Sequence, residues 1–303
     1  METFETHRSV LFSLAYRMLG SVADAEDAVQ ETYVRWREQA GQKIQNLRSY
    51  LCTTLTRLCI DSLRSARMQR ENYIGPWLPE PLHEEVMHSE LSTPELAESL
   101  SMAFLIMLES LSPVERAVFL LREIFQFEFD EIACIVQKSA ENCRQIASRA
   151  RKRLSQRSSR FSANSDQARQ LSQVFLQACY DGDLEKLTAL LARDVTLYSD
   201  GGGKVPSALR PLQGASDVGR FLLGILQKAP VGISLHADSV NGQPGFRAML
   251  NGQLLSVLSL DIADGEILSV FIVNNPDKLR HLNAGIISEK KREGVSHEDD
   301  GSD

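Results

Sequence analysis

The amino-acid sequence predicts two all-helical domains followed by an α+β domain. Apolar residues recur at helical spacing over residues 5–70 and again over residues 96–160. Between these segments lie prolines, which interrupt a helix and mark a linker. From about residue 166 the pattern changes, because Asn-Gly and Asp-Gly pairs separate strand-like runs. Together these observations predict a multidomain protein.

The first helical domain is expected over residues 5–70, as three helices. The apolar stripe Val10–Met18 stops at Gly20, and a second helix begins near Ala23. This second helix has an apolar face and a separate acidic face. The third helix is expected over Arg48–Arg70, with its leucines inward and several arginines available to solvent.

Charge is segregated along the chain. The net charge is −7, but residues 140–160 contain seven Lys or Arg and one acid. No Lys or Arg occurs between Arg70 and Arg116, so we expect residues 71–98 to form an acidic, proline-containing linker. The overall acidity does not exclude nucleic acid as a partner, because separate blocks of charge serve separate electrostatic tasks.

The second helical domain is expected over residues 99–157, and Asp130–Leu154 have the layout of a helix-turn-helix motif. In such motifs the second helix enters the major groove by its N-terminal residues. Its polar residues are predicted to face base edges or the nearest phosphates: Glu141, Asn142, Arg144, Gln145 and Ser148. Its basic residues are predicted to meet phosphates: Arg149, Arg151, Lys152 and Arg153. The alternative is a solvated basic helix in an ordinary bundle.

The α+β domain is expected over residues 166–283. Two amphipathic helices come first, and Asp183 caps the second. Strand-like runs follow, separated by Asn251-Gly252 and Asp264-Gly265, which are strong hairpin signals. A twisted antiparallel sheet packed against a few helices is the natural arrangement. Residues 284–303 are expected to be a disordered, finally acidic tail.

Several kinds of site are not expected. No apolar run approaches the ~18 residues that span a bilayer, and the N-terminus lacks the regions of a signal peptide. We therefore expect a cytoplasmic protein without membrane contact. The five cysteines form no C-x-x-C pair and the six histidines have no ligand spacing, so neither a metal site nor a cofactor is expected.

Residues Asp24–Trp36 resemble region 2.2 of extracytoplasmic-function (ECF) sigma factors, which belong to the sigma-70 family. In that family this helix docks on the clamp coiled coil of the β′ subunit of RNA polymerase. The resemblance implies that core polymerase is bound by Asp24, Asp27, Gln30, Glu31 and Trp36. An acidic helix face suits a basic helical partner. The alternative is an exposed charged face that contacts nothing.

Residues Arg48–Arg70 resemble regions 2.3 and 2.4, and Leu58–Asp61 stand at the family's L-A-[LI]-D. The family uses this helix and the preceding loop to melt the −10 element. The resemblance implies −10 DNA contacts by Tyr50, Arg57, Asp61, Arg64 and Arg67. Position 57 holds Arg where many members have Asn, so the fine −10 preference does not carry over. For Tyr50 the alternative is a buried position.

Residues Ser99–Arg157 resemble region 4, and Leu111–Arg116 match its opening L-S-P-x-x-R. The resemblance implies recognition of the −35 element and contact with the polymerase β flap. Arg144 falls where many members have Lys or Arg in the recognition helix. Ile146 stands where many have Arg, so a DNA contact at that position does not carry over.

Three further segments are similar to signatures of the ECF subgroup with a C-terminal SnoaL-like extension. They imply two all-α sigma domains, a region 2 bundle and a region 4 helix-turn-helix, followed by an α+β cone of the SnoaL or NTF2 kind. Interdomain or regulatory contacts are implied for Trp77, Leu78, Pro79, Glu80, Pro81, Asp200, Gly201, Gly202, Gly203, Lys204, Asn275, Pro276, Asp277, Lys278 and Leu279. The alternatives are a plain spacer for residues 77–81, a flexible hairpin loop for residues 200–204 and a capped terminal turn for residues 275–279. A phosphate loop at Asp200–Lys204 is rejected, because its spacing differs and no helix follows.

The resemblance implies a non-catalytic promoter-specificity subunit that binds core RNA polymerase and promoter DNA, directs transcription initiation and is regulated in cis by its C-terminal domain. Three alternatives stay open. SnoaL-like folds include cyclases and isomerases, and His236, Asp238 and Asp200 are available as acid–base groups. A small ligand bound in the C-terminal cone is the second. A helix-turn-helix repressor that never contacts polymerase is the third.

Overall fold

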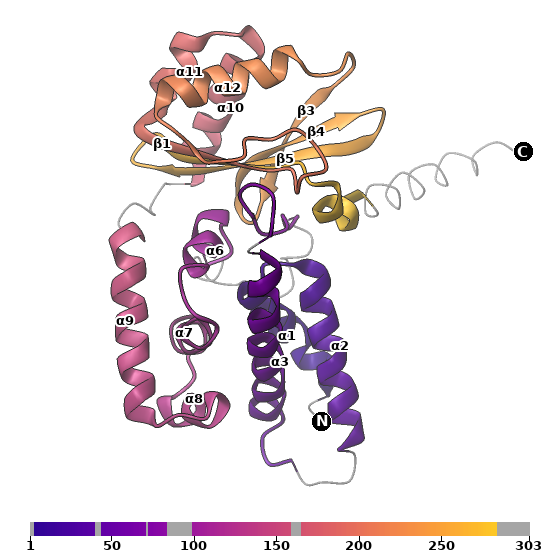
Figure 1. Ribbon diagram of the computed structural model, residues 1–303, viewed down its shortest axis with the longest axis vertical. Helices are drawn as coiled ribbons and strands as arrows, with labels where there is room; N and C mark the ends of the chain where they lie inside the picture. Colours follow the sequence, from indigo (N-terminus) through magenta and orange to yellow (C-terminus); the bar gives the residue numbers. More distant parts are fainter. Residues whose placement is uncertain (1–2, 40–43, 71, 84–98, 159–164, 284–303) are drawn as a thin grey trace, which may run out of the picture.

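The computed structural model describes residues 3–39, 44–70, 72–83, 99–158 and 165–283, with side chains outside the description at 66–70, 156–158 and 165. Most of the predicted linker and the predicted acidic tail lie outside the described residues. The α+β part lies at one end of the molecule and the helical parts at the other (Figure 1).

The N-terminal helices form a three-helix bundle. They are α1 (Phe4–Leu19), α2 (Val22–Glu38) and α3 (Leu47–Arg70). Helix α1 ends at Gly20, which has φ 70° and donates its N–H to the Tyr16 carbonyl. The next residue, Ser21, already caps α2, because its side chain accepts a hydrogen bond from the Asp24 amide at 3.2 Å. The chain therefore turns sharply between α1 and α2.

The second helical part contains the predicted helix-turn-helix. Its elements are α6 (Met102–Leu108), α7 (Pro113–Phe119), the π-helical turn η1 (Leu120–Ile124), α8 (Phe129–Val136) and α9 (Ala140–Ser158). A capping box begins α7, in which the Ser112 amide donates to the Glu115 carboxylate at 2.9 Å. Between α8 and α9 the chain turns at Gln137, which has φ 55°.

The C-terminal part is an α+β domain, as predicted. Its helices are α10 (Ser165–Asp181), α11 (Leu184–Leu190), α12 (Ala215–Gln227) and the 3-10 turn η2 (Pro276–Leu279). Its strands are β1 (Leu191–Asp200), β2 (Leu212–Gln213), β3 (Ser234–Val240), β4 (Gln243–Leu250), β5 (Gln253–Ala263) and β6 (Glu266–Val273). The strand order is β2-β1-β6-β5-β4-β3. The sheet is not wholly antiparallel, because the β3–β6 meander returns its last strand beside β1 in parallel orientation.

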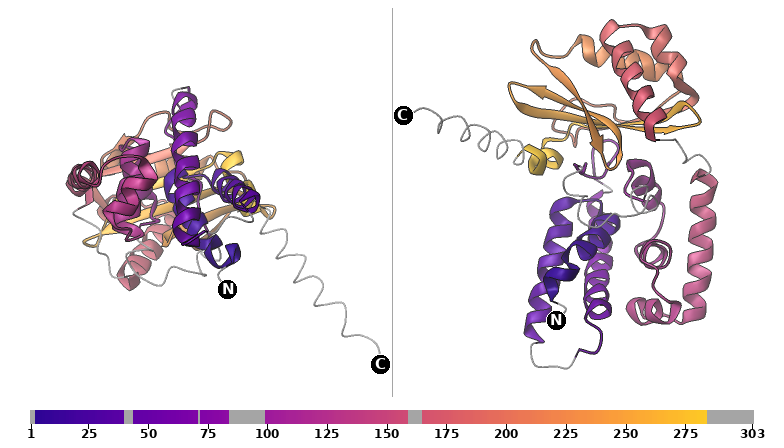
Figure 2. Two further views of the ribbon diagram at one scale, coloured as in Figure 1. Left: turned by 90° about the horizontal axis from the view of Figure 1, so that it is seen from below. Right: turned by 180° about the vertical axis from the view of Figure 1, so that it is seen from behind.

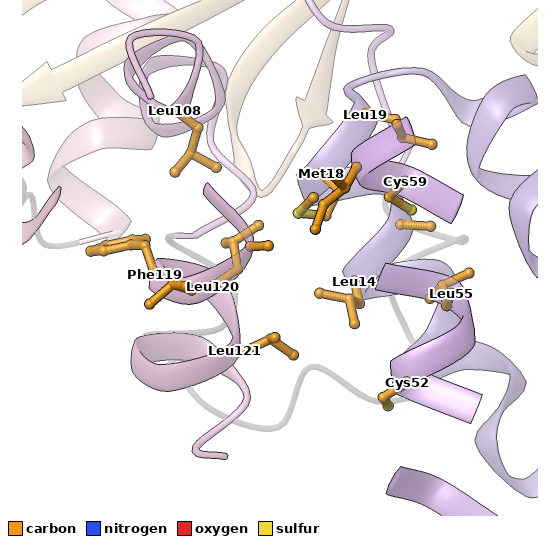
Figure 3. Packing of buried hydrophobic residues seen from close by; sticks show 14 of the residues in the cluster. Leu14, Met18, Leu19, Cys52, Leu55, Cys59, Leu108, Phe119, Leu120 and Leu121 are labelled. Carbon is orange, nitrogen blue, oxygen red and sulfur yellow. The ribbon is translucent and has the colours of Figure 1, made fainter. Parts of the chain in front are cut away.

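The two helical parts share one hydrophobic core. Side chains of α1 and α3 lie opposite side chains of α6, α7 and η1 (Figure 3). Examples are Leu14, Met18 and Leu55 on one side and Leu120 and Leu121 on the other, and all five are essentially inaccessible to solvent. The hydrophobic effect therefore holds the two helical parts together.

The sheet is buried on both faces, which explains its continuous apolar runs. Along β6, Val270 and Ile272 face the core beneath α10–α12, whereas Phe271 and Val273 face the opposite core. The opposite core also takes in the 72–83 segment, α6 and η2. The views from the front and from behind both place the sheet between α10–α12 and the helical parts (Figures 1 and 2).

Gly20 lies so close to Trp77 that a side chain at this position is expected to destabilise the fold. A Cβ at Gly20 would lie 2.7 Å from the Trp77 ring, and Lys278 lies 4.1 Å from the centre of that ring, which limits its movement. Gly20→Ala is expected to lower the free energy of unfolding by about 1–3 kcal/mol more than a matched control. Gly182→Ala is that control, because Gly182 has φ 67° but nothing within 4 Å of its Cβ position. Urea denaturation measures both, and equal losses would contradict the role of Trp77.

Candidate functional site

The predicted polymerase-binding residues lie along α2. Asp24, Asp27, Gln30 and Glu31 are exposed, and Glu31 pairs with Arg35 at 2.8 Å. These residues form a continuous polar face on the outside of the bundle. Trp36 differs from them, because it is half-buried and stacks on Phe4 with ring centres 5.9 Å apart. Trp36 therefore has a packing role in this arrangement.

The predicted −10 residues on α3 do not form one surface. Asp61 and Arg64 are exposed and pair with each other at 3.2 Å. Tyr50 is half-buried against the shared core. Arg57 donates to the Cys134 and Ile135 carbonyls at 2.8 and 3.1 Å. The side chain of Arg67 lies outside the described residues.

The Arg57 contacts join α3 to the helix-turn-helix. The two carbonyls belong to the last turn of α8, where a helix carries partial negative charge. A guanidinium at this position satisfies carbonyls that have no partner within the helix. Nothing in the sequence pattern indicated this contact, because its partners are backbone atoms.

Helix α9 has one buried and one exposed face. Cys143, Ile146 and Ala150 are buried, so Ile146 points inward rather than toward DNA. The exposed polar and basic side chains include those of Glu141, Arg144, Gln145, Ser148, Arg149, Arg151, Lys152 and Arg153. Asn142 is half-buried. Arg153 contacts the Ser110 carbonyl at 3.0 Å, so it also anchors α9 to the α6–α7 corner.

The three predicted interdomain segments meet at a buried carboxylate. Asp200 has no exposed surface. It accepts hydrogen bonds from the Tyr73 hydroxyl at 2.5 Å, the Leu78 amide at 2.8 Å and the Gly202 amide at 3.0 Å. Its ion-pair partner is Lys278 at 2.7 Å. These residues, Tyr73, Leu78, Asp200, Gly202 and Lys278, are called the Asp200 cluster below.

Lys278 is held on several sides at once. Its ammonium group donates to the Leu78 carbonyl and lies 5.1 Å from the centre of the Tyr73 ring and 4.1 Å from that of Trp77. Cation–π contacts of this kind strengthen when water is excluded. Burial and the Asp200 carboxylate raise the pKa of the Tyr73 hydroxyl, so this group stays protonated and donates.

The glycine loop after β1 is built for close contact. A Cβ at Gly202 would meet the Asn275 side chain at 2.2 Å, and one at Gly203 would meet Ile74 at 2.7 Å. Gly201 is equally confined, because its Cβ would lie 2.4 Å from the Val205 carbonyl. At the rim, Lys204 pairs with Asp277 and lowers the pKa of that carboxyl group. Pro276 occupies the first position of η2, and Leu279 is buried.

Glu80 binds the corner between α1 and α2. Its carboxylate accepts from the Val22 amide at 2.7 Å and the Ser21 hydroxyl at 3.0 Å. Negative charge is favourable at a helix N-terminus. Its backbone amide donates to the Gly20 carbonyl at 2.8 Å, and Pro79 lies against Gly20. Residues 72–83 are therefore bound to the first bundle on one side and to the C-terminal domain on the other. There the Pro81 carbonyl lies 2.8 Å from the His281 ring nitrogen Nε2.

The predicted acid–base candidates of the C-terminal domain have structural partners. Asp200 belongs to the Asp200 cluster. Asp238 pairs with Arg247 at 2.8 Å and with His83 at 3.2 Å. His236 is exposed and lies 2.9 Å from the Ser234 hydroxyl. Within the described residues, no group of His, Cys, Asp or Glu side chains is arranged to hold a metal ion. None of the helices in the described ranges combines the length and apolarity that a membrane span needs.

The Asp200 cluster generates a prediction about buried and exposed charge. Asp200→Asn leaves the Lys278 charge buried without its counterion, which is expected to cost about 3–5 kcal/mol of unfolding free energy. Asp277→Asn is the matched control in the same interface, because the Lys204–Asp277 pair is half-exposed and worth about 1 kcal/mol or less. Adding Lys278→Met to Asp200→Asn is expected to restore part of the loss. Urea denaturation that finds equal losses for both aspartates would contradict this account.

Comparisons with known proteins agree with this arrangement. Residues 3–68 match the model of sigma-70 region 2, and residues 101–154 match that of sigma-70 region 4. The chain is 35% identical to the ECF RNA polymerase sigma factor SigJ of Mycobacterium tuberculosis over 91% of both chains. It is 33% identical to a probable ECF sigma factor, SigI, of the same species over 93% of this chain and 95% of that one. The crystal structure of SigJ superposes with a TM-score of 0.73 at 32% identity and covers 91% of this chain and 96% of that chain. This chain therefore belongs to the ECF RNA polymerase sigma factors.

Proposed function

We propose that this protein directs promoter-specific transcription initiation as a subunit of RNA polymerase, and that its C-terminal domain regulates this activity in cis. The observation that carries the regulatory part is the Asp200 cluster. Through it the C-terminal domain binds the segment that connects region 2 to region 4. The linker must extend between the domains that recognise the two promoter elements, and residues of this linker are bound to the C-terminal domain instead.

The described surfaces support a division of labour. The exposed acidic face of α2 suits the β′ clamp, because a basic helical partner would complement Asp24, Asp27 and Glu31. The exposed N-terminal half of α9 suits the major groove at the −35 element. Region 4 is further proposed to contact the β flap. Arg57, Asp61, Arg64 and Arg67 are proposed to reach −10 DNA once α3 is free.

The arrangement described here is a closed one. Helix α3 packs against α7 and α8, and the Arg57 guanidinium donates hydrogen bonds to the carbonyls at the end of α8. Region 4 must therefore leave α3 before the whole of α3 can bind DNA. The α9 face stays exposed in the closed arrangement. We infer that −35 duplex recognition is compatible with this closed form, whereas −10 melting requires its opening.

Regulation by contact between domains is favoured over a small ligand in the C-terminal domain. Buried apolar side chains pack between the sheet and α10–α12, among them Phe175, Leu222 and Phe246. Catalysis is not part of this proposal, since His236, Asp238 and Asp200 already serve structural contacts.

Run-off transcription tests the central proposal. Core polymerase with the full-length protein is expected to initiate specifically at a native upstream promoter. Protein cut after about residue 165 is expected to initiate there with higher output, because the linker is released from the C-terminal domain. No initiation and no binding to core by the folded protein would contradict the sigma role. Identical output from both proteins would contradict cis regulation.

Duplex binding tests the face of α9. Arg144→Ala is expected to weaken binding to the −35 duplex by about tenfold, within the range for one lost base contact. Arg220→Ala in α12 is the matched control, since both arginines pair with an acid one turn earlier, at 3.7 and 3.8 Å. Fluorescence anisotropy measures both variants. Unchanged affinity for Arg144→Ala would remove this residue from the recognition surface.

A further inference from the structure

Asn241 lies in the tight turn between β3 and β4 and has no exposed surface. Its φ of 53° is left-handed, a conformation that Asn tolerates better than most residues, and Gly242 follows with φ 73°. The Asn-Gly pair accounts for the hairpin turn but not for the burial of the side chain. Hairpin turns usually lie at the surface, so this burial needs a separate explanation.

The side chain of Asn241 contacts three other parts of the chain. The side-chain Oδ1 of Asn241 accepts from the Leu82 backbone amide at 2.8 Å. The backbone amide of Asn241 donates to the Leu82 carbonyl at 2.9 Å. Its Nδ2 donates to the Tyr16 hydroxyl at 2.8 Å and to the Leu100 carbonyl at 2.9 Å. Tyr16 belongs to α1 in region 2, Leu82 to the linker, and Leu100 to the entry into region 4.

The hydrogen-bond directions at this junction are fixed. The Tyr16 hydroxyl has one proton, which it donates to the Glu80 carbonyl at 2.6 Å, so it must accept from Asn241. The Leu100 carbonyl can only accept. Both N–H groups of the Asn241 side-chain amide are therefore needed as donors, one for each of these oxygens. Its Oδ1 is needed as the acceptor for the Leu82 backbone amide. Burial raises the pKa of the Tyr16 hydroxyl, which keeps its proton in place.

We propose that Asn241 is a positioning residue through which the C-terminal domain holds region 2, the linker and region 4 in the closed arrangement. This proposal rests on the cis regulation proposed above and deepens it. The Asp200 cluster binds only the linker, whereas Asn241 joins both sigma domains through one amide group. An aspartate has nearly the same shape but no N–H donors, so the Leu100 carbonyl and the Tyr16 hydroxyl oxygen would lose the hydrogen bonds that they accept from Asn241.

The chain provides a matched control in the next hairpin. Asn251 begins the β4–β5 turn, is also followed by Gly, and has φ 52°. It is exposed, whereas Asn241 is buried. Asn251→Asp therefore repeats the chemical change and the backbone geometry of Asn241→Asp without the junction. Any difference between the two variants reports the contacts and not the turn.

Hydrogen–deuterium exchange of the full-length protein tests the proposal directly. Asn241→Asp is expected to speed exchange in peptides containing residues 78–83 and α6 on the order of tenfold to a hundredfold, the range for buried groups left unsatisfied. Asn251→Asp is expected to leave those peptides unchanged. Tyr16→Phe removes the other side of the contact with a small change in shape, so it serves if Asn241→Asp fails to fold. Wild-type exchange rates in folded Asn241→Asp, or in Tyr16→Phe when Asn241→Asp does not fold, would overturn the proposal.

Run-off transcription with the same proteins separates this proposal from the proposed function. Faster exchange together with changed promoter output supports both. Faster exchange with unchanged output supports the role of Asn241 in closure and contradicts cis regulation. Unchanged exchange contradicts the role of Asn241 whatever the promoter output.

Discussion

The closed arrangement depends on the carboxylate of Asp200. A buried charge is costly unless it is paired and hydrogen-bonded. Here two backbone amides, one hydroxyl and one ammonium group satisfy it, and three of these four donors come from the linker or from η2. Removing the linker from the C-terminal domain would therefore leave both Asp200 and Lys278 incompletely partnered. Residues 72–83 of the linker are consequently bound between the first bundle and the C-terminal domain.

The burial of the sheet on both faces acts in the same direction. The sheet of the C-terminal domain is covered by helices on one face and needs a cover for the other, which residues 72–83, α6 and η2 provide. Apolar surface such as Phe271 and Leu254 would be exposed if the sigma domains moved away. Opening for promoter DNA thus requires another partner that compensates for this surface and these charges. Core polymerase, which binds the sigma domains, is the natural candidate.

Sequence patterns predicted the local features well. Apolar spacing identified the helices, because it depends on residues a few positions apart. The Asn251-Gly252 and Asp264-Gly265 turns were predictable for the same reason. The parallel pairing of β1 with β6 was not, since nothing local distinguishes it from an antiparallel pairing. Arg57 and Asn241 also escaped prediction, because several of their partners are backbone groups distant in sequence.

By itself, therefore, the sequence determined the family and the succession of helical and α+β domains. Periodicity, capping and turn chemistry operate within a few residues and can be read along the chain. The tertiary structure alone decided that regions 2 and 4 share a core, that Arg57 contacts α8, and that Asn241 joins three segments. The hydrogen bonds of Arg57 and Asn241 join residues that are 77 to 225 positions apart, and only packing brings such residues together.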